Sequence, residues 1–131
     1  MDSMGRIENK FLDLKLKFIK KLPDRFNDIQ KDWDDLDPRS WSQEKAVGIH
    51  RKVHSLVGIS GIHGLDYLSV SAKKLEDKIE MATQKGVRPT DEWRIAVQSL
   101  LIELGEAIQQ DSNQQGSNQQ GSNQNSIEGS Q

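Results

Sequence analysis

His54 is the side chain of this 131-residue chain that is best placed to do chemistry. The segment around it has a mainly apolar stripe at helical spacing, made of Ile49, Val53, Leu56 and Ser60, with Ala46 at its margin. His54 falls nearly opposite this stripe, so a helix here turns its imidazole toward solvent. The outward face around it holds Val47, His50, Arg51, Gly58 and Gly61. An exposed imidazole is a nucleophile and a proton carrier, which makes His54 a candidate reactive group.

Two glycines on the same outward face indicate that another molecule approaches the imidazole closely. Gly58 and Gly61 follow His54 by about one and two helical turns. Each glycine in a helix interior costs about 1 kcal/mol relative to alanine, so their presence calls for a reason. Close packing against another helix is the alternative reason. Their position away from the apolar stripe favours clearance for a partner instead.

A metal site is the second chemical reading of this segment. His50 and His54 are four residues apart, the spacing of a helical zinc pair. However, Arg51 and Lys52 place positive charge between the two imidazoles, and the sequence offers no evident third ligand. We therefore expect no metal. His63 is expected to be a residue at the helix end without a functional role.

The first third of the chain is predicted to be helical. One apolar stripe consists of Ile7, Phe11, Leu14, Phe18 and Leu22, and a second consists of Phe26, Ile29, Trp33 and Leu36. Pro23 separates them. Because proline lacks an N–H and clashes with the preceding turn, the pattern leaves two possibilities, one kinked helix or two helices.

Three more helices are predicted to follow. Ser40 or Ser42 is expected to cap the first, Asp66 the second and Thr90 the third. The inward residues of the second are expected to be Leu68, Ala72, Leu75, Ile79 and Ala82, and a stop is expected at Lys85-Gly86. The inward residues of the third are expected to be Trp93, Ala96, Val97, Leu100, Leu101, Leu104, Ala107 and Ile108. The connections are short, which predicts an all-α, up-and-down antiparallel four-helix bundle with an extra N-terminal helical segment.

The composition changes abruptly near residue 111. Ser112-Asn113-Gln114-Gln115-Gly116 recurs at 117–121 and begins again at Ser122. Because this five-residue repeat has no apolar face to bury, 111–131 is predicted to be a flexible linker or disordered tail. The predicted domains are thus a helical bundle at 1–110 and the repeat tail at 111–131.

Composition narrows the class of partner. The net charge is −2 and cysteine is absent, so neither nucleic-acid binding nor a membrane surface is expected, and thiol chemistry is excluded. No signal-peptide core or apolar run long enough to span a bilayer is present, and we expect a cytoplasmic monomer. The sequence also lacks a glycine-rich nucleotide loop, which argues against an autonomous kinase.

The segment around His54 resembles the signature of the histidine-containing phosphotransfer (HPt) family. The matching residues are His54, Ser55, Leu56, Ser60, Gly58 and Gly64, and the resemblance covers roughly residues 7–108. It implies a four-helix bundle in which His54 accepts a phosphoryl group and donates it to aspartates of response-regulator receiver domains. It also implies no cofactor in this chain, with Mg²⁺ bound by the receiver domain, and a carrier rather than an enzyme.

Two residues depart from the HPt pattern. Val57 stands where lysine is most common in the family, and His63 stands where an aromatic or aliphatic residue is usual. Without that lysine, Arg51 is the nearest cation on the histidine face. The residues expected to flank the site and dock the partner are His50, Arg51, Val57, Gly58 and Gly61. Val57 also supports the alternative function, an HPt-like bundle that only docks a protein partner.

Overall fold

The computed structural model describes residues 2–36, 41–84 and 89–129 as four α-helices and one short 3-10 turn. The helices are α1 (Asp2–Asp34), α2 (Gln43–Ile62), α3 (Asp66–Glu80) and α4 (Asp91–Gly129), and the 3-10 turn η2 (Met81–Thr83) follows α3. No β-strand occurs in these ranges. The predicted all-α class and four-helix bundle are confirmed.

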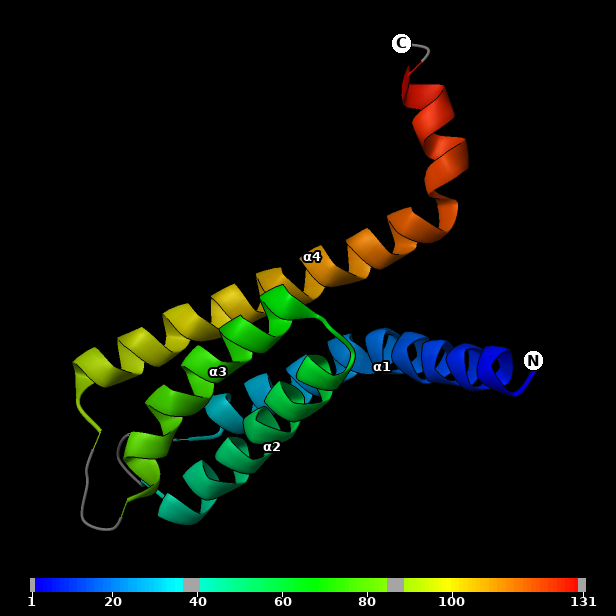
Figure 1. Cartoon of the computed structure of the whole chain (residues 1–131). Coiled ribbons are helices and arrows are strands. Elements are labelled where there is room, and N and C mark those ends of the chain that lie inside the picture. Colours follow the sequence, from blue (N-terminus) through cyan, green and yellow to red (C-terminus); the bar gives the residue numbers. More distant parts are fainter. Residues whose placement is uncertain (1, 37–40, 85–88, 130–131) are drawn as a thin grey trace.

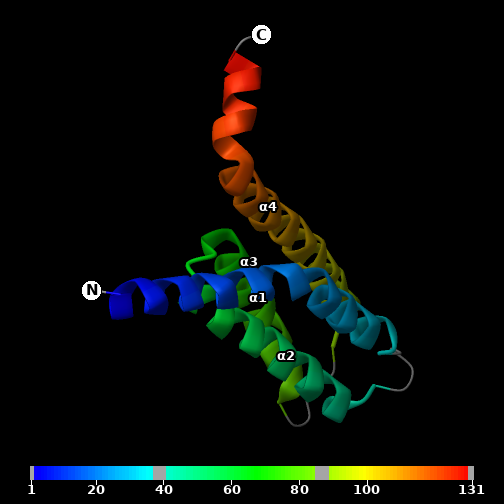
Figure 2. The same ribbon diagram turned by 90° about the vertical axis from the view of Figure 1, so that its right-hand side faces the viewer.

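The helices form a ring in chain order. α2 packs against α1 and α3, α3 packs against α2 and α4, and α4 closes the ring by contacting α1. Figures 1 and 2 show the resulting antiparallel arrangement. The core between the helices holds the predicted inward residues of α2 and α3, all of them buried. Trp33, Trp41 and Trp93 pack together, with ring centroids 5.7 Å apart in each contact with Trp93.

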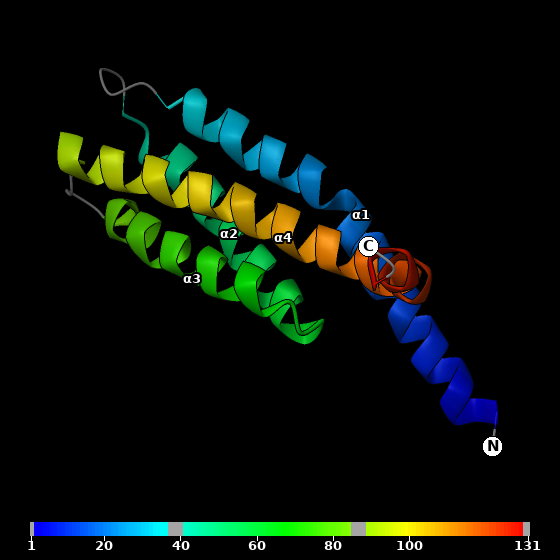
Figure 3. The same ribbon diagram turned by 90° about the horizontal axis from the view of Figure 1, so that it is seen from above.

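α1 is one helix of 33 residues with Pro23 inside it. Figure 3 shows that the helix bends along its length, as expected where a proline ring removes one backbone hydrogen bond and crowds the preceding turn. Phe18 and Leu22 are buried, whereas the first turns of the same stripe project beyond the bundle. The extra N-terminal segment is thus the first half of α1 and not a separate helix.

Two of the predicted helix caps are present and one is wrong. Ser42 accepts a hydrogen bond from the Lys45 backbone N–H at 3.2 Å, and Thr90 accepts one from the Trp93 N–H at 3.1 Å. Asp66 does not cap α3. The N-cap position is Leu65, and the side chain that accepts the Leu68 N–H, at 3.1 Å, is Asp111 of α4. The alternative cap Ser40 and the predicted stop at Lys85-Gly86 lie outside the described residues.

α4 differs from the sequence prediction at its C-terminal end. The α4 helix continues over the five-residue repeats to Gly129. Asp111 is buried against α3, so the packed part of α4 includes at least this residue. The division into domains at residue 110 stays a prediction. No helix within the described ranges is both long and apolar enough to cross a bilayer.

Candidate functional site

His54 lies in the middle of α2 and points away from the core. Its side chain is 73 % exposed, while Val53 and Leu56 beside it are buried. The helix is fixed in this rotation because its inward stripe fills the bundle interior. Ser60 belongs to the same stripe, and its hydroxyl donates to the Leu56 carbonyl at 2.6 Å. His54 therefore points outward, as predicted.

Glu76 of α3 holds the imidazole from one side. Its Oε2 is hydrogen-bonded to the Nδ1 atom of His54. The Glu76 side chain is only 5 % exposed, so this carboxylate is one of few charged groups inside the described bundle. Burial alone would raise the pKa of Glu76, but the hydrogen bonds from His54 and Lys73 outweigh it and lower the pKa. Glu76 is therefore ionised at neutral pH.

The ionised carboxylate selects one tautomer of His54. An anionic oxygen accepts a hydrogen bond and cannot donate one, so Nδ1 carries the proton and donates it to Glu76. In the neutral form of the ring, the Nε2 atom then has the free lone pair. Since the ring is mostly exposed, this nucleophilic nitrogen faces solvent.

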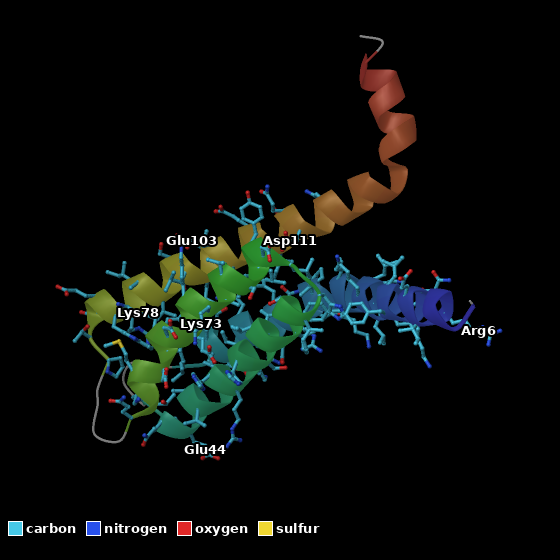
Figure 4. All side chains as sticks on the ribbon, in the orientation of Figure 1. Arg6, Glu44, Lys73, Lys78, Glu103 and Asp111 are labelled. Carbon is cyan, nitrogen blue, oxygen red and sulfur yellow. The ribbon has the colours of Figure 1, made fainter. Side chains whose placement is uncertain are left out.

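Lys73 is the cation that the structure ties to the site. Figure 4 shows Lys73 on α3. Its Nζ atom lies 3.1 Å from Glu76 Oε1 and 3.2 Å from Asp77 Oδ1, one turn further along the same helix. The two carboxylates raise the pKa of Lys73, because their hydrogen bonds favour its charged form. Lys73 therefore neutralises the Glu76 oxygen that His54 does not use.

His50 lies one turn before His54 on the same helix face. The two rings are nearly parallel, with centroids 6.2 Å apart and 14° between their planes. His50 Nε2 is 3.9 Å from Glu76 Oε2, which is too long for a hydrogen bond. His50 is thus a neighbour of the Glu76–His54 pair. No cluster of three His, Cys, Asp or Glu side chains suited to a metal ion is found among the described residues.

The two glycines beside His54 differ in their surroundings. A Cβ atom at Gly58 would meet nothing within 4 Å, so this position is open. A Cβ atom at Gly61 would lie 3.7 Å from Ser69 Oγ, an ordinary van der Waals contact. Neither glycine is needed for helix packing. Val57 is partly buried and packs against the core, at the edge of the exposed face.

Arg51 lies on the other side of the site from Lys73. It lines a hollow of about 240 Å³ between α1 and α2, together with Arg25 and Lys52. Lys52 is already paired with Asp28 at 2.8 Å and with Asp32. The sequence predicted Arg51 as the nearest cation on the histidine face. In the structure, Lys73 is the cation that shares the Glu76 carboxylate with His54.

His63 has a defined structural place. It is the C-cap residue of α2, and its ring lies 5.2 Å from that of Phe11 and 5.5 Å from that of Phe18. Its neighbour Gly64 has a φ of 69°, a backbone angle that glycine adopts at little cost and that ends the helix. His63 thus joins the end of α2 to the first half of α1.

Sequence reasoning missed Glu76, the partner of the central residue. A signal was present, since Glu76 follows Ala72 by four residues and Leu75 by one, and so falls inside the inward arc of α3. A carboxylate in an apolar arc must be paired when it is buried. Which residue pairs with Glu76 depends on how α2 and α3 pack. A pattern of neighbouring residues in the sequence does not give that packing.

Comparison of the chain with models of known protein families, with curated proteins and with solved structures finds no match.

Proposed function

We propose that this protein is a phosphoryl carrier of the HPt type, in which His54 accepts a phosphoryl group from the phospho-aspartate of a receiver domain and donates it to another. The observation that carries the proposal is the exposed imidazole of His54, with Nδ1 held by Glu76 and Nε2 free. The HPt-like signature at His54, Leu56 and Gly58 agrees with it.

In the forward step, the lone pair of His54 Nε2 attacks the phosphorus of the aspartyl phosphate. A bond from Nε2 to phosphorus forms while the bond from phosphorus to the aspartate oxygen breaks, and the aspartate leaves as a carboxylate. In the neutral Nδ1–H tautomer the attacking nitrogen carries no proton, so no proton has to move. The chemistry thus depends on positioning and on charge stabilisation, as in other phosphoryl transfers.

Glu76 has an electrostatic role in this step. Because Nδ1 keeps its proton, the ring becomes positively charged when Nε2 gains the phosphoryl group. The Glu76 carboxylate, in direct contact with Nδ1, stabilises that charge. In the reverse step the bond from Nε2 to phosphorus breaks as an aspartate oxygen of a receiver domain bonds to phosphorus, and the ring returns to its neutral form with Nε2 free. Any Mg²⁺ for the reaction would be bound by the receiver domain.

The face around His54 has room for the partner. The position of Gly58 is open, so the loops of a receiver domain could approach the ring without meeting a side chain there. Lys73 places positive charge beside the site, although Val57 replaces the lysine common in the HPt family. We assign the docking contacts to the surface formed by His50, Arg51, Val57, Gly58 and Gly61.

Labelling by phosphorylated receiver domains tests the proposal. A panel of receiver domains, each carrying radioactive aspartyl phosphate, is incubated with the wild type and with His54→Gln. We expect label that is stable in alkali and labile in acid on the wild type, and none on the variant, which circular dichroism should show to be folded. Label that persists in His54→Gln contradicts the assignment. Tight binding of a receiver without any transfer would favour the docking-only function.

A further inference from the structure

The first half of α1 has an apolar stripe that the described bundle covers only in part, where the Phe11 ring contacts His63. Ile7, Phe11 and Leu14 lie in phase with the buried Phe18 and Leu22, at 3–4 residue spacing. Yet they are 64 %, 46 % and 54 % exposed, because α1 projects past the ends of its neighbours. This apolar stripe thus extends past the end of the bundle core. An exposed apolar surface of this kind indicates that a partner covers it.

The same half of α1 is strongly basic. Residues 5–21 contain six Lys and Arg against two Asp and Glu, in a chain whose net charge is −2. None of the six forms an ion pair with another residue of the described part of the chain. Arg6 and Lys10 lie along one edge of the apolar stripe by helical spacing. This surface therefore suits an apolar partner with an acidic border.

A groove of that kind lies on the bundle itself, between α3 and α4. It encloses about 480 Å³ and has the apolar side chains of Tyr67, Val70 and Ala107 in its lining. Three acids border it, Asp66, Glu103 and Glu106, against one cation, Lys74. Tyr67 and Val70 are 60 % and 57 % exposed. Figure 4 shows Glu103 on α4 and Arg6 at the far end of α1.

The α1 helix of a chain does not reach the α3–α4 groove of that same chain. Within the described residues α1 contacts α2 and α4 but not α3, and its first half bends away from the bundle. A bilayer surface is also a poor fit for the stripe. Because the stripe faces the same side as the bundle core, a flat surface laid against it would meet the bundle. A convex basic helix and a concave acidic groove on one chain point to another copy of that chain.

We propose that the protein associates with itself through the first half of α1 of one copy, which docks in the α3–α4 groove of another. Ile7, Phe11 and Leu14 would cover Tyr67 and Val70, while Arg6 and Lys10 would lie against Glu103 and Glu106. This contact departs from the monomer expected from composition. It uses neither His54 nor the face around it, so it is independent of the phosphoryl-carrier proposal.

The strength expected of this contact is modest. One helix of about four turns in a shallow groove buries less than a standard interface, so association should fall in the micromolar range or weaker. It should also weaken with salt, since at about 1 M the screening length is only about 3 Å. Reversing two charges at such a border should weaken association about tenfold or more.

Charge reversal tests the proposal on the full chain. Sedimentation equilibrium is measured from tens to hundreds of micromolar for the wild type, for Arg6→Glu with Lys10→Glu, and for Glu103→Lys with Glu106→Lys. We expect the wild type to associate, each double variant alone to be mainly monomeric, and an equal mixture of the two to associate again, because opposite charges then face each other. Lys31→Glu with Lys45→Glu matches the charge change of the first variant away from both surfaces and should behave as the wild type.

Three results would overturn this interface. One is a single-chain mass for the wild type at every concentration. Another is association that neither double variant weakens. The third is a mixture that stays monomeric although both variants keep the helical content and thermal transition of the wild type.

Discussion

Replacing Glu76 by glutamine removes one charge from the site and leaves its shape nearly unchanged. The glutamine side chain can still accept the His54 Nδ1 hydrogen bond through its amide oxygen, or donate through its amide nitrogen. It therefore no longer selects one tautomer. Lys73 loses one of its two carboxylate partners and keeps Asp77. The change thus separates the charge of Glu76 from its volume.

The magnitude follows from Coulomb's law. Opposite charges 4 Å apart attract by about 4 kcal/mol at an effective dielectric constant of 20 and by about 1 kcal/mol in water. Glu76 is buried but the His54 ring is 73 % exposed, so the effective dielectric constant is closer to that of water. The attraction between the two charges is then about 1–2 kcal/mol. Since 1.4 kcal/mol corresponds to a factor of ten, Glu76→Gln should lower the equilibrium constant for phosphorylation of His54 about tenfold. Stability should change by no more than about 1 kcal/mol, since burial of the wild-type carboxylate has its own cost.

Two measurements check this prediction. Long-range ¹H–¹⁵N spectra report which ring nitrogen carries the proton, and need no partner. We expect the Nδ1–H tautomer for His54 in the wild type and a shift toward Nε2–H in Glu76→Gln. Phosphate exchange with a receiver domain then gives the equilibrium constant. A wild type with mainly Nε2–H, or a variant with an unchanged tautomer and equilibrium constant, would refute the electrostatic role of Glu76.

Two other variants test the surroundings of the site and the end of the bundle. Gly58→Gln should raise helix stability by up to about 1 kcal/mol, because the position is open, and should slow transfer by blocking the partner; a variant that unfolds would show that Gly58 packs. Burial raises the pKa of Asp111 above its ordinary value of 3.8 despite the Leu68 N–H, so the folded state favours the protonated acid, and this contribution to stability is lost as pH rises through the raised pKa. Asp111→Asn should therefore gain stability relative to the wild type as pH rises from about 4 to 7 in thermal melts. If the variant instead loses about 1 kcal/mol at pH 7, the value of an ordinary cap, the ionised carboxylate is a net benefit.

Periodicity in the sequence predicts the packed faces well, because each helix of the bundle buries one stripe. Ile49, Val53 and Leu56 are all buried, and His54 opposite them is exposed. Local chemistry also predicts the Thr90 cap, since its hydroxyl reaches an N–H only three residues away. In each of these cases, the contact that fixes the position of the residue lies within one or two helical turns of it.

The features that the sequence did not predict depend on contacts between distant residues. Asp66 has the right type and position for a cap, but Asp111 reaches the Leu68 N–H from 43 residues away. Glu76 pairs with His54 across two helices, 22 residues apart. The N-terminal stripe of α1 shows the same limit, since Ile7 and Leu22 fit one pattern although only Leu22 is buried. A periodic pattern identifies the apolar face of a helix. It does not show how far along that face the neighbouring helices extend.

The position of the phosphoryl group on the modified protein tests the central claim most directly. The wild type is phosphorylated by a receiver domain, and long-range ¹H–¹⁵N and ³¹P spectra assign the nitrogen that is bonded to phosphorus. We expect phosphorus on Nε2 of His54 alone, with a proton on Nδ1 in contact with Glu76. Phosphorus on Nδ1 of His54, or on His50 or His63, would contradict it.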